Sequence, residues 1–259
     1  ASYQGRVGRF GFAVEASRSP VTDSLLSYAG TVDPRTGQAF GGVLRQGGRV
    51  DLSIDVADAV YYLWVAGYNL PGTNVETNNQ GIASFGAEWR LLPRSEGNVS
   101  VGANILGMGY QENLSQFTLG HGGYFSPQVF VRAGVPFTWS KTEGDLQWHA
   151  VVDPGVNWFR TDEITFYPGF PELTGLRSEI EDAQTSYAEQ SVGSFSLNAV
   201  GEVNYALTGS FRIGARVDLH TAQDYTEYSG GIFLRQTFGR SPQSEPPALD
   251  DWGVLAAAD

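Results

Sequence analysis

The sequence of 259 residues contains no cysteine, so neither a disulfide framework nor a thiolate metal site is available to it. Basic residues are scarce: 16 Lys and Arg stand against 28 Asp and Glu, a formal net charge of −12. Nucleic acid is therefore not an expected partner, because a phosphate-binding surface needs concentrated positive charge. The longest apolar run, Ala59 to Leu70, is too short for a membrane helix and has the length of a strand.

The composition that remains is typical of a β-rich protein. Thirty-three glycines, 13% aromatic residues and 17% charged residues fit strands joined by many tight turns. The clearest strand runs from Phe211 to Leu219, where every odd position is apolar and every even position is charged or glycine. Successive side chains of a strand point to opposite faces, so this stretch has one apolar face and one polar face. Its length suits a strand that crosses a bilayer at a tilt.

The same alternation recurs along the chain and predicts about ten strands, the first over residues 3–17. Long connections, such as residues 20–42 and 160–187, alternate with short turns. Outer-membrane barrels combine short periplasmic turns with long outer loops, and an even strand count puts both termini in the periplasm. We therefore predict an all-β fold, a transmembrane antiparallel up-and-down β-barrel over residues 1–238. The alternative is a soluble sandwich or lipocalin-like barrel, with its polar face outward and its apolar face inward.

Two loops carry a more specific signal. Residues 20–30 read Pro-Val-Thr-Asp-Ser-Leu-Leu-Ser-Tyr-Ala-Gly, and residues 119–128 read Leu-Gly-His-Gly-Gly-Tyr-Phe-Ser-Pro-Gln. Together with Asp33-Pro34 and Asp251-Trp252, they resemble the C-terminal barrel of cellulose synthase operon protein C. The resemblance implies an outer-membrane channel through which a polysaccharide, above all cellulose, passes from the periplasm to the cell exterior.

The resemblance also implies partners and a larger whole. The partners are the cellulose chain, outer-membrane lipid and lipopolysaccharide, a periplasmic tetratricopeptide-repeat region and the inner-membrane cellulose synthase complex. The family barrel has roughly sixteen strands, so we expect this chain to hold about the last ten of them. A closed barrel of ten strands would have its interior largely filled by side chains, whereas a wide channel needs more strands.

The glycine-rich loop at residues 120–123 has two interpretations. It lacks the Lys-Ser/Thr of a phosphate-binding loop and does not open a helix, which leaves a tight turn whose glycines adopt positive φ. The functional interpretation makes His121, Tyr124 and Phe125 part of an outer gate of the channel.

The connection over residues 160–187 is rich in acids and contains Tyr167 and Phe170. It is either a solvated loop that attracts divalent cations or lipopolysaccharide, or a segment that folds over the pore and offers aromatic faces to sugar rings. Cellulose is uncharged, so aromatic platforms and hydrogen-bonding side chains are the chemistry that its path would use. Tyr62, Trp64 and Tyr68 are further candidates for such platforms, provided that they face the lumen.

Three histidines raise the question of catalysis, because some outer-membrane barrels are enzymes. A nucleophile needs a base within hydrogen-bond reach and a third group that orients the base. His149 shares a strand face with Asp153, and His220 lies near Asp218, but the sequence has no Gly-x-Ser-x-Gly motif and no specific metal-ligand spacing. We therefore predict a passive channel with no catalytic residue, no metal and no cofactor. The alternative function is a barrel enzyme or a loop-mediated adhesin.

Residues 239–259 form a predicted periplasmic tail. Pro246-Pro247 cannot belong to a further ladder strand, because proline donates no backbone hydrogen bond. The tail nevertheless carries Trp252, Val254 and Leu255. We expect it to dock at the periplasmic mouth or against a preceding periplasmic domain, with Trp252 as the anchor. The alternative is a disordered end that tolerates truncation.

Overall fold

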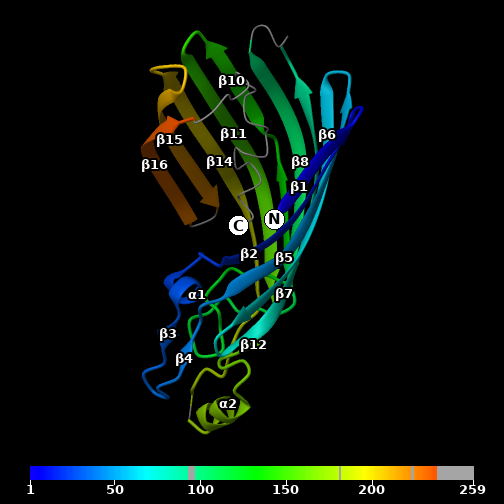
Figure 1. The fold of residues 1–259 in the computed structure, drawn as a ribbon. Coiled ribbons are helices and arrows are strands. Elements are labelled where there is room, and N and C mark those ends of the chain that lie inside the picture. Colours follow the sequence, from blue (N-terminus) through cyan, green and yellow to red (C-terminus); the bar gives the residue numbers. More distant parts are fainter. Residues whose placement is uncertain (93–96, 181, 223–224, 238–259) are drawn as a thin grey trace.

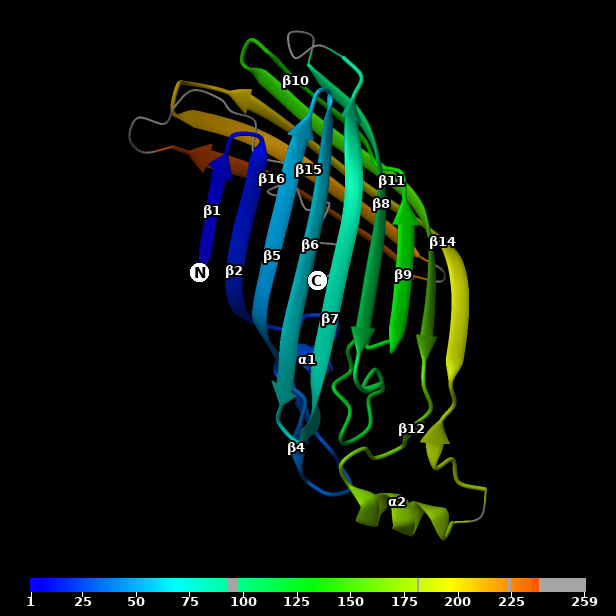
Figure 2. The ribbon, with the colours of Figure 1, turned by 90° about the vertical axis from the view of Figure 1, so that its right-hand side faces the viewer.

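The computed structural model describes residues 1–92, 97–180, 182–222 and 225–237. Most of them form one large, curved antiparallel sheet, and loops with two short helices gather at one of its ends (Figures 1 and 2). The strands of the sheet are β1 (Ser2–Val7), β2 (Phe10–Pro20), β5 (Leu44–Val56), β6 (Ala59–Gly72), β7 (Val75–Arg90), β8 (Asn98–Tyr110), β9 (Val129–Gly134), β10 (Phe137–Glu143), β11 (Leu146–Thr161), β14 (Gln190–Ala206), β15 (Phe211–Ala222) and β16 (Tyr225–Gln236).

The remaining elements lie in the long connections. They are α1 (Leu25–Ala29), β3 (Thr31–Val32), β4 (Ala39–Phe40), β12 (Ile164–Thr165), α2 (Pro171–Ser178) and β13 (Ser186–Tyr187). Among the residues that the structure describes, neither helix is long and apolar enough to span a membrane. At the opposite end of the sheet, the connections that the structure describes throughout are short turns (Figure 2).

Strands β9 and β10 share a single place in the sheet. Both pair with β8 on one side and with β11 on the other, in one continuous register. Pro136 interrupts them because proline has no N–H to give to the ladder. Pairing continues around it, since Val135 donates its N–H to the Pro154 carbonyl at 2.9 Å and Gly102 donates to the Pro136 carbonyl at 2.7 Å. The 12-stranded sheet therefore has eleven strand positions, each antiparallel to its neighbours.

The expected single strand over residues 3–17 is wrong. The hairpin of β1 and β2 occupies this stretch, with Gly8 at φ 61° in its turn. A two-residue turn leaves almost no gap in the sequence pattern, which is why the alternation hid it. An odd number of positions makes β1 and β16 run in the same direction, toward the short-turn end. Ser2 pairs with Glu15, midway along β2, so the N-terminus does not lie at the short-turn end as expected.

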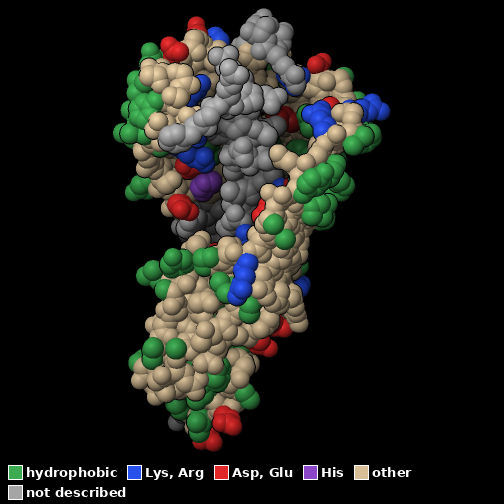
Figure 3. Space-filling view, viewed as in Figure 1, with side chains coloured by type: hydrophobic (Ala, Val, Ile, Leu, Met, Phe, Trp, Pro, Cys, Tyr) green, Lys and Arg blue, Asp and Glu red, His purple; other side chains and the backbone are tan. Residues whose placement is uncertain are grey.

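The predicted alternation of faces is confirmed. In β15, Ile213 is 38% and Val217 61% exposed on one face, while Arg216 and Asp218 form an ion pair at 2.7 Å on the other. The same exposed apolar face carries Leu52, Val65, Phe85, Ile105, Val131, Val156, Trp158, Phe195 and Val203. Figure 3 looks into the hollow of the sheet, where charged and histidine side chains lie, whereas hydrophobic side chains gather on the outer flanks. This arrangement is the reverse of what a soluble sandwich or lipocalin-like barrel requires.

The apolar core lies at the loop end instead of between two sheets. We call this region the cap and define it as residues 21–43, 111–128, 162–180 and 182–189. One cluster joins it to the ends of β6 and β7 and consists of Val21, Val43, Leu70, Val75, Leu114 and Tyr124. A second cluster lies within the cap and consists of Leu26, Phe40, Leu119 and Tyr167. The long connections thus form a packed layer over one end of the sheet.

Candidate functional site: the polar face and the cap

Hydrogen bonds between distant connections hold the cap together. The Phe125 N–H donates to the Asp23 carboxylate at 3.0 Å, and the Asn113 amide donates to the Asp162 carbonyl at 2.9 Å. Arg35 also donates to the Tyr167 hydroxyl at 3.1 Å. Each bond joins two different long connections, so the cap is one unit rather than a set of independent loops.

His121 lies fully buried inside this unit. Its Nε2 is 3.3 Å from the Thr165 carbonyl oxygen, and its ring meets the Tyr187 ring edge-to-face with centroids 5.5 Å apart. The Nδ1 atom has no hydrogen-bond partner among the described residues. Burial lowers the pKa of His121 to about 4, and the hydrogen bond to Thr165 only partly offsets this. The imidazole is therefore a neutral packing group between two loops at ordinary pH.

The glycines around His121 adopt the conformations that the tight-turn interpretation predicts. Gly120 has φ 97° and Gly123 has φ 67°, both in the left-handed region. A Cβ at Gly120 would lie 2.1 Å from the Pro168 carbonyl oxygen, so the loop also approaches the neighbouring connection too closely for a side chain. The glycine-rich sequence is thus a packing device of the cap.

Tyr124 is 1% exposed and anchors the cap to the sheet. Its hydroxyl accepts a hydrogen bond from the Asn78 amide at 3.1 Å. The same amide group donates to the Glu112 carbonyl at 2.8 Å and accepts from the Glu112 N–H at 2.9 Å. Burial raises the pKa of Tyr124 far above its ordinary range. Sequence reasoning missed Asn78, because its polar neighbourhood is typical of a loop, whereas the structure places it in β7.

Tyr167 and Phe170 also pack inside the cap. Tyr167 is 9% exposed, and Phe170 lies at the start of α2, where its N–H donates to the Tyr167 carbonyl at 3.1 Å. The neighbouring Phe166 ring stacks on Tyr187 at 4.9 Å, and the Arg177 guanidinium lies 3.7 Å from the Phe166 centroid. The aromatic part of the acidic connection therefore covers the end of the sheet, with its rings turned toward one another.

Tyr62, Trp64 and Tyr68 all project from the polar face of β6. Their cross-strand neighbours on β5 include Asp51 opposite Trp64 and Gly47 opposite Tyr68, and arginines two positions before these partners lie over the two rings. The Arg49 guanidinium lies 4.2 Å from the Trp64 ring centroid, and the Arg45 guanidinium lies 4.8 Å from that of Tyr68. Trp64 is only 3% exposed. The surface that this part of the wall offers is therefore largely guanidinium, and Trp64 supports it from beneath.

A buried ion pair spans the middle of the polar face. Arg132 Nη1 lies 2.9 Å from the Asp153 carboxylate, with side-chain exposures of 12% and 3%. Arg132 also donates to the Asp153 carbonyl at 3.0 Å and to Asn104 at 3.4 Å. A Cβ at Gly134 would lie 2.5 Å from the guanidinium, so glycine lets this side chain lie flat against the wall. No sequence motif marks this group beyond the alternation itself.

The other two histidines lie on the polar face. His220 Nδ1 is 3.2 Å from the Asn198 amide oxygen. His149 lies in register between Ser140 and Glu202, an order of residue types that resembles a hydrolase triad. Glu202, however, accepts a hydrogen bond from Asn204 at 2.6 Å and lies 3.9 Å from Arg216. Its carboxylate is engaged by these two groups as part of the wall, which favours the interpretation of His149 as a polar wall residue.

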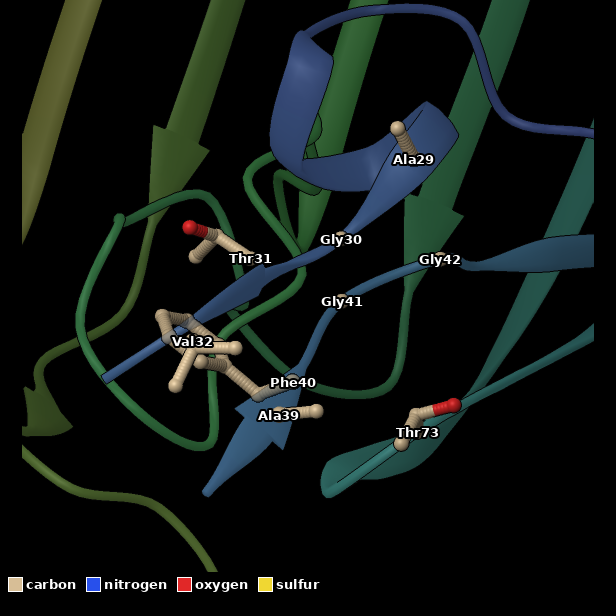
Figure 4. Close-up of a pocket in the computed structure, with 9 residues that line it drawn as sticks. All are labelled: Ala29, Gly30, Thr31, Val32, Ala39, Phe40, Gly41, Gly42 and Thr73. Carbon is tan, nitrogen blue, oxygen red and sulfur yellow. The ribbon is translucent and has the colours of Figure 1, made fainter. Parts of the chain in front are cut away.

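A pocket of about 300 Å³ opens on the cap between the end of α1, the β3–β4 hairpin and the end of β6 (Figure 4). Thr31 and Val32 lie on one side of it and Thr73 on the other (Figure 4). Its lining contains no charged side chain. In the part of the chain that the structure describes, no group of three His, Asp or Glu side chains could hold a metal ion. The predicted anchor Trp252 and its tail lie outside the described residues.

The chain is similar to known proteins over most of its length. The family model described as the C-terminus of cellulose synthase operon protein C matches residues 1–239. Proteins named cellulose synthase operon protein C are similar over most of the chain: 32% identical over 93% of it in Xanthomonas axonopodis pv. citri, 34% over 88% in Pseudomonas fluorescens and 32% over 90% in Salmonella typhimurium. The chain spans 17%, 17% and 20% of these relatives' lengths. It belongs to the family of the cellulose synthase operon protein C C-terminus, as the two loops predicted.

Proposed function

We propose that the chain forms part of an outer-membrane β-barrel channel that exports a polysaccharide, cellulose, from the periplasm to the cell exterior. The observation that carries the proposal is the division of the sheet into an exposed apolar face and a polar face with paired charges. Backbone groups in lipid must be satisfied internally, which paired strands achieve. Lipid covers the apolar face, and the polymer passes along the polar face.

The height of the apolar face supports this orientation. Trp148 and Trp158 lie on the same face of β11, ten positions apart. Ten residues of strand span about 33 Å, and a tilt of about 40° reduces this to about 25 Å, the height of the apolar band in such barrels. Trp148 meets Trp139 edge-to-face at 5.8 Å, and the Trp158 indole donates to Ser191 at 3.1 Å. Aromatic side chains at both borders are typical of the membrane interface.

In this orientation the short turns face the periplasm and the cap faces the exterior. Strand β16 runs toward the short turns, so residues 239–259 follow on the periplasmic side, where Trp252 would dock. The edges β1 and β16 run in the same direction, so pairing them directly would not give an antiparallel barrel. The roughly sixteen strands that the family resemblance implies would place five between them, an odd number that fits these directions.

The cap is proposed as the outer gate. His121, Tyr124, Tyr167 and Phe170 close it by packing the long connections against one another and against Asn78. A polymer leaving the channel must displace this unit, and the hydrogen bonds between connections would make it move as one body. The wall below presents paired charges, so it offers hydrogen bonds to an uncharged glucan without a strong steering field.

The whole protein's partners follow from the same proposal. They are the cellulose chain, outer-membrane lipid and lipopolysaccharide at the cap, a periplasmic repeat region and the inner-membrane synthase complex. The channel itself performs no covalent chemistry in this scheme, so it needs no cofactor. The family's connection to a cellulose synthase operon supports this assignment over a barrel enzyme or an adhesin.

These 259 residues contain no cysteine, so a cysteine introduced here can be followed with the unsubstituted protein as its background. Val156 and Asn157 are neighbours on opposite faces of β11, and Val156 is 59% exposed. We expect Asn157→Cys in the full-length protein to react with a membrane-impermeant thiol reagent, which would reduce both channel current in planar bilayers and cellulose secretion by cells. Val156→Cys should be protected by lipid and leave both unchanged. Equal labelling of the two variants would contradict the channel.

A further inference from the structure

A second group of aromatic rings lies on the polar face, directly beneath the cap. Phe130 is near the start of β9 and Phe159 near the end of β11, and they pair across the two strands. Both belong to the same face as Arg132 and Asp153 by strand alternation. Phe125 reaches them from the cap, with ring centroids 6.1 Å from Phe130 and 5.2 Å from Phe159.

The geometry of this group leaves a ring surface available. Phe125 meets its neighbours at interplanar angles of 88° and 87°, so it contacts their rings edge-to-face instead of stacking on them. Phe125 is 40% exposed, and the other two are half-buried. Its backbone N–H is fixed by the Asp23 carboxylate at 3.0 Å, which holds the loop in place. The ring is therefore positioned from behind and open on one side.

The contrast with β6 decides between two candidate platforms. Trp64 is 3% exposed and lies under the Arg49 guanidinium, so no sugar ring reaches its face without displacing Arg49. Among the described residues, no Lys or Arg lies over Phe125, Phe130 or Phe159. The three phenylalanines thus present aromatic surface that the arginine-covered rings do not.

The chemistry of a β-1,4-glucan matches such a surface. All its hydroxyl groups are equatorial, so each pyranose ring presents two faces of axial C–H bonds. These carry partial positive charge and pack against the negative face of an aromatic ring. A phenylalanine side chain forms no directional hydrogen bond, so it binds a polymer weakly wherever along its length the polymer stands. Such binding suits a chain that must slide.

Resting on the proposed export function, we infer that Phe125, Phe130 and Phe159 form the last sugar-binding platform of the channel, where the glucan contacts the wall before it meets the cap. Two of the rings belong to the rigid wall and the third to the cap. A sugar ring seated there contacts both parts at once, which places the platform where the polymer first acts on the gate.

The test is current blockade by cellohexaose, with the full-length protein in planar bilayers. We expect Phe125→Ala and Phe159→Leu each to raise the dissociation constant of the blocking sugar about tenfold, with blockade in each variant measured against its own current without sugar. Phe125→Tyr keeps an aromatic ring, so cellohexaose should block this variant with the same dissociation constant as the wild type. Phe195→Ala is the matched control, because Phe195 lies 63% exposed on the apolar face, and it should also match the wild type.

Cellulose secretion by cells, measured in parallel, separates the two proposals. If the wild type secretes cellulose while Phe125→Ala and Phe159→Leu are blocked like the wild type, the platform is wrong and the export function stands. If cells lacking the protein secrete cellulose normally, the export function is wrong, and the platform falls with it. Phe159→Leu keeps apolar volume in the wall, so it tests the ring even if Phe125→Ala disturbs the cap.

Discussion

The sheet and the cap obey opposite rules for the same kinds of side chain. In the sheet, apolar residues such as Phe195 and Val217 are more than 60% exposed, and most of the charged residues face the hollow (Figure 3). In the cap, Val43, Leu114 and Leu119 are fully buried, as in any protein that folds in water. The difference teaches that two solvents act on one chain: the proposed lipid inverts the usual pattern in the sheet, and water restores it in the cap.

The largest expected effect lies in the wall. Asp153→Ala leaves the 12%-exposed Arg132 without its carboxylate, which costs about 3–5 kcal/mol for a buried pair. Urea unfolding in lipid vesicles, followed by tryptophan fluorescence, measures the loss. Asp55→Ala is the control, because its partner Arg6 and Asp55 itself are 63% and 39% exposed, and less than about 1 kcal/mol is expected there. Similar losses in both variants would mean that the polar face is uniformly hydrated.

The next prediction compares the same substitution, to lysine, on the two faces of one strand. Leu197 and Asn198 are neighbours on β14, and they pair with Pro154 and Asp153 in the middle of β11. Leu197→Lys places a charge on the proposed lipid face and should cost about 2–4 kcal/mol, whereas Asn198→Lys, beside acidic groups on the polar face, should cost little. The same unfolding assay compares them. A greater loss in Asn198→Lys would reverse the assignment of the faces.

The third prediction uses pH to change the stability of the closed cap. Burial holds the pKa of His121 at about 4, below its ordinary 6.5. An opened cap exposes the imidazole, so it binds a proton more tightly than the closed cap. The closed state therefore keeps its full stability above pH 6.5 and loses on the order of 1.4 kcal/mol per pH unit as the pH falls from there toward 4. We expect more frequent channel opening at pH 5 than at pH 7.5.

Two comparisons control this titration: a variant of a second histidine, and a carboxyl group whose pH effect has the opposite sign. His121→Gln should remove most of the pH dependence, and His220→Gln, on the polar face, should keep it. Burial, with the nearby carboxylates of Glu76 and Asp162, raises the pKa of Glu112 and so acts in the opposite direction. The difference between wild type and His121→Gln isolates the imidazole. An unchanged profile in that variant would remove His121 from the closure of the cap.

The smallest expected effect comes from weakening the hydrogen bond that anchors the cap to the sheet. Tyr124→Phe removes the hydroxyl that accepts from Asn78 and should cost about 1 kcal/mol of cap stability. The rate of proteolytic cleavage within the cap should rise accordingly, while urea unfolding of the sheet stays the same. Tyr205→Phe, on the apolar face at 48% exposure, should change neither measurement.

The part of the fold that the sequence predicts is the part with a local rule. Alternation places Ile213 and Arg216 on opposite faces without any knowledge of their neighbours, and the two glycine-rich and proline-rich loops identify the family. The turn at Gly8 escaped because it leaves no gap in the alternation. The parity of the strands, and with it the position of the N-terminus, was wrong for that reason.

The candidate site was predicted less well because its contacts are not local. His121, Tyr124, Phe125, Tyr167 and Phe170 do gather at one end of the sheet, as their place in long loops indicates. Nothing in the sequence shows that Arg49 covers Trp64, or that Phe130 and Phe159 meet Phe125. These pairings depend on the register of the strands. Alternation alone does not fix the register, because a shift by any even number of residues keeps every side chain on the same face.

The hydrogen bonds between the long connections also bear on the order of folding. Arg35 and Tyr167 are 132 residues apart in sequence, and their hydrogen bond closes a loop that contains most of the strands. Such a contact forms only after its ends have been brought together, whereas hairpins such as β5–β6 close over a few residues. We therefore expect the strands between these two residues to assemble before this part of the cap does. A newly assembled molecule would then pass through a stage in which these strands are paired and its outer end is still open.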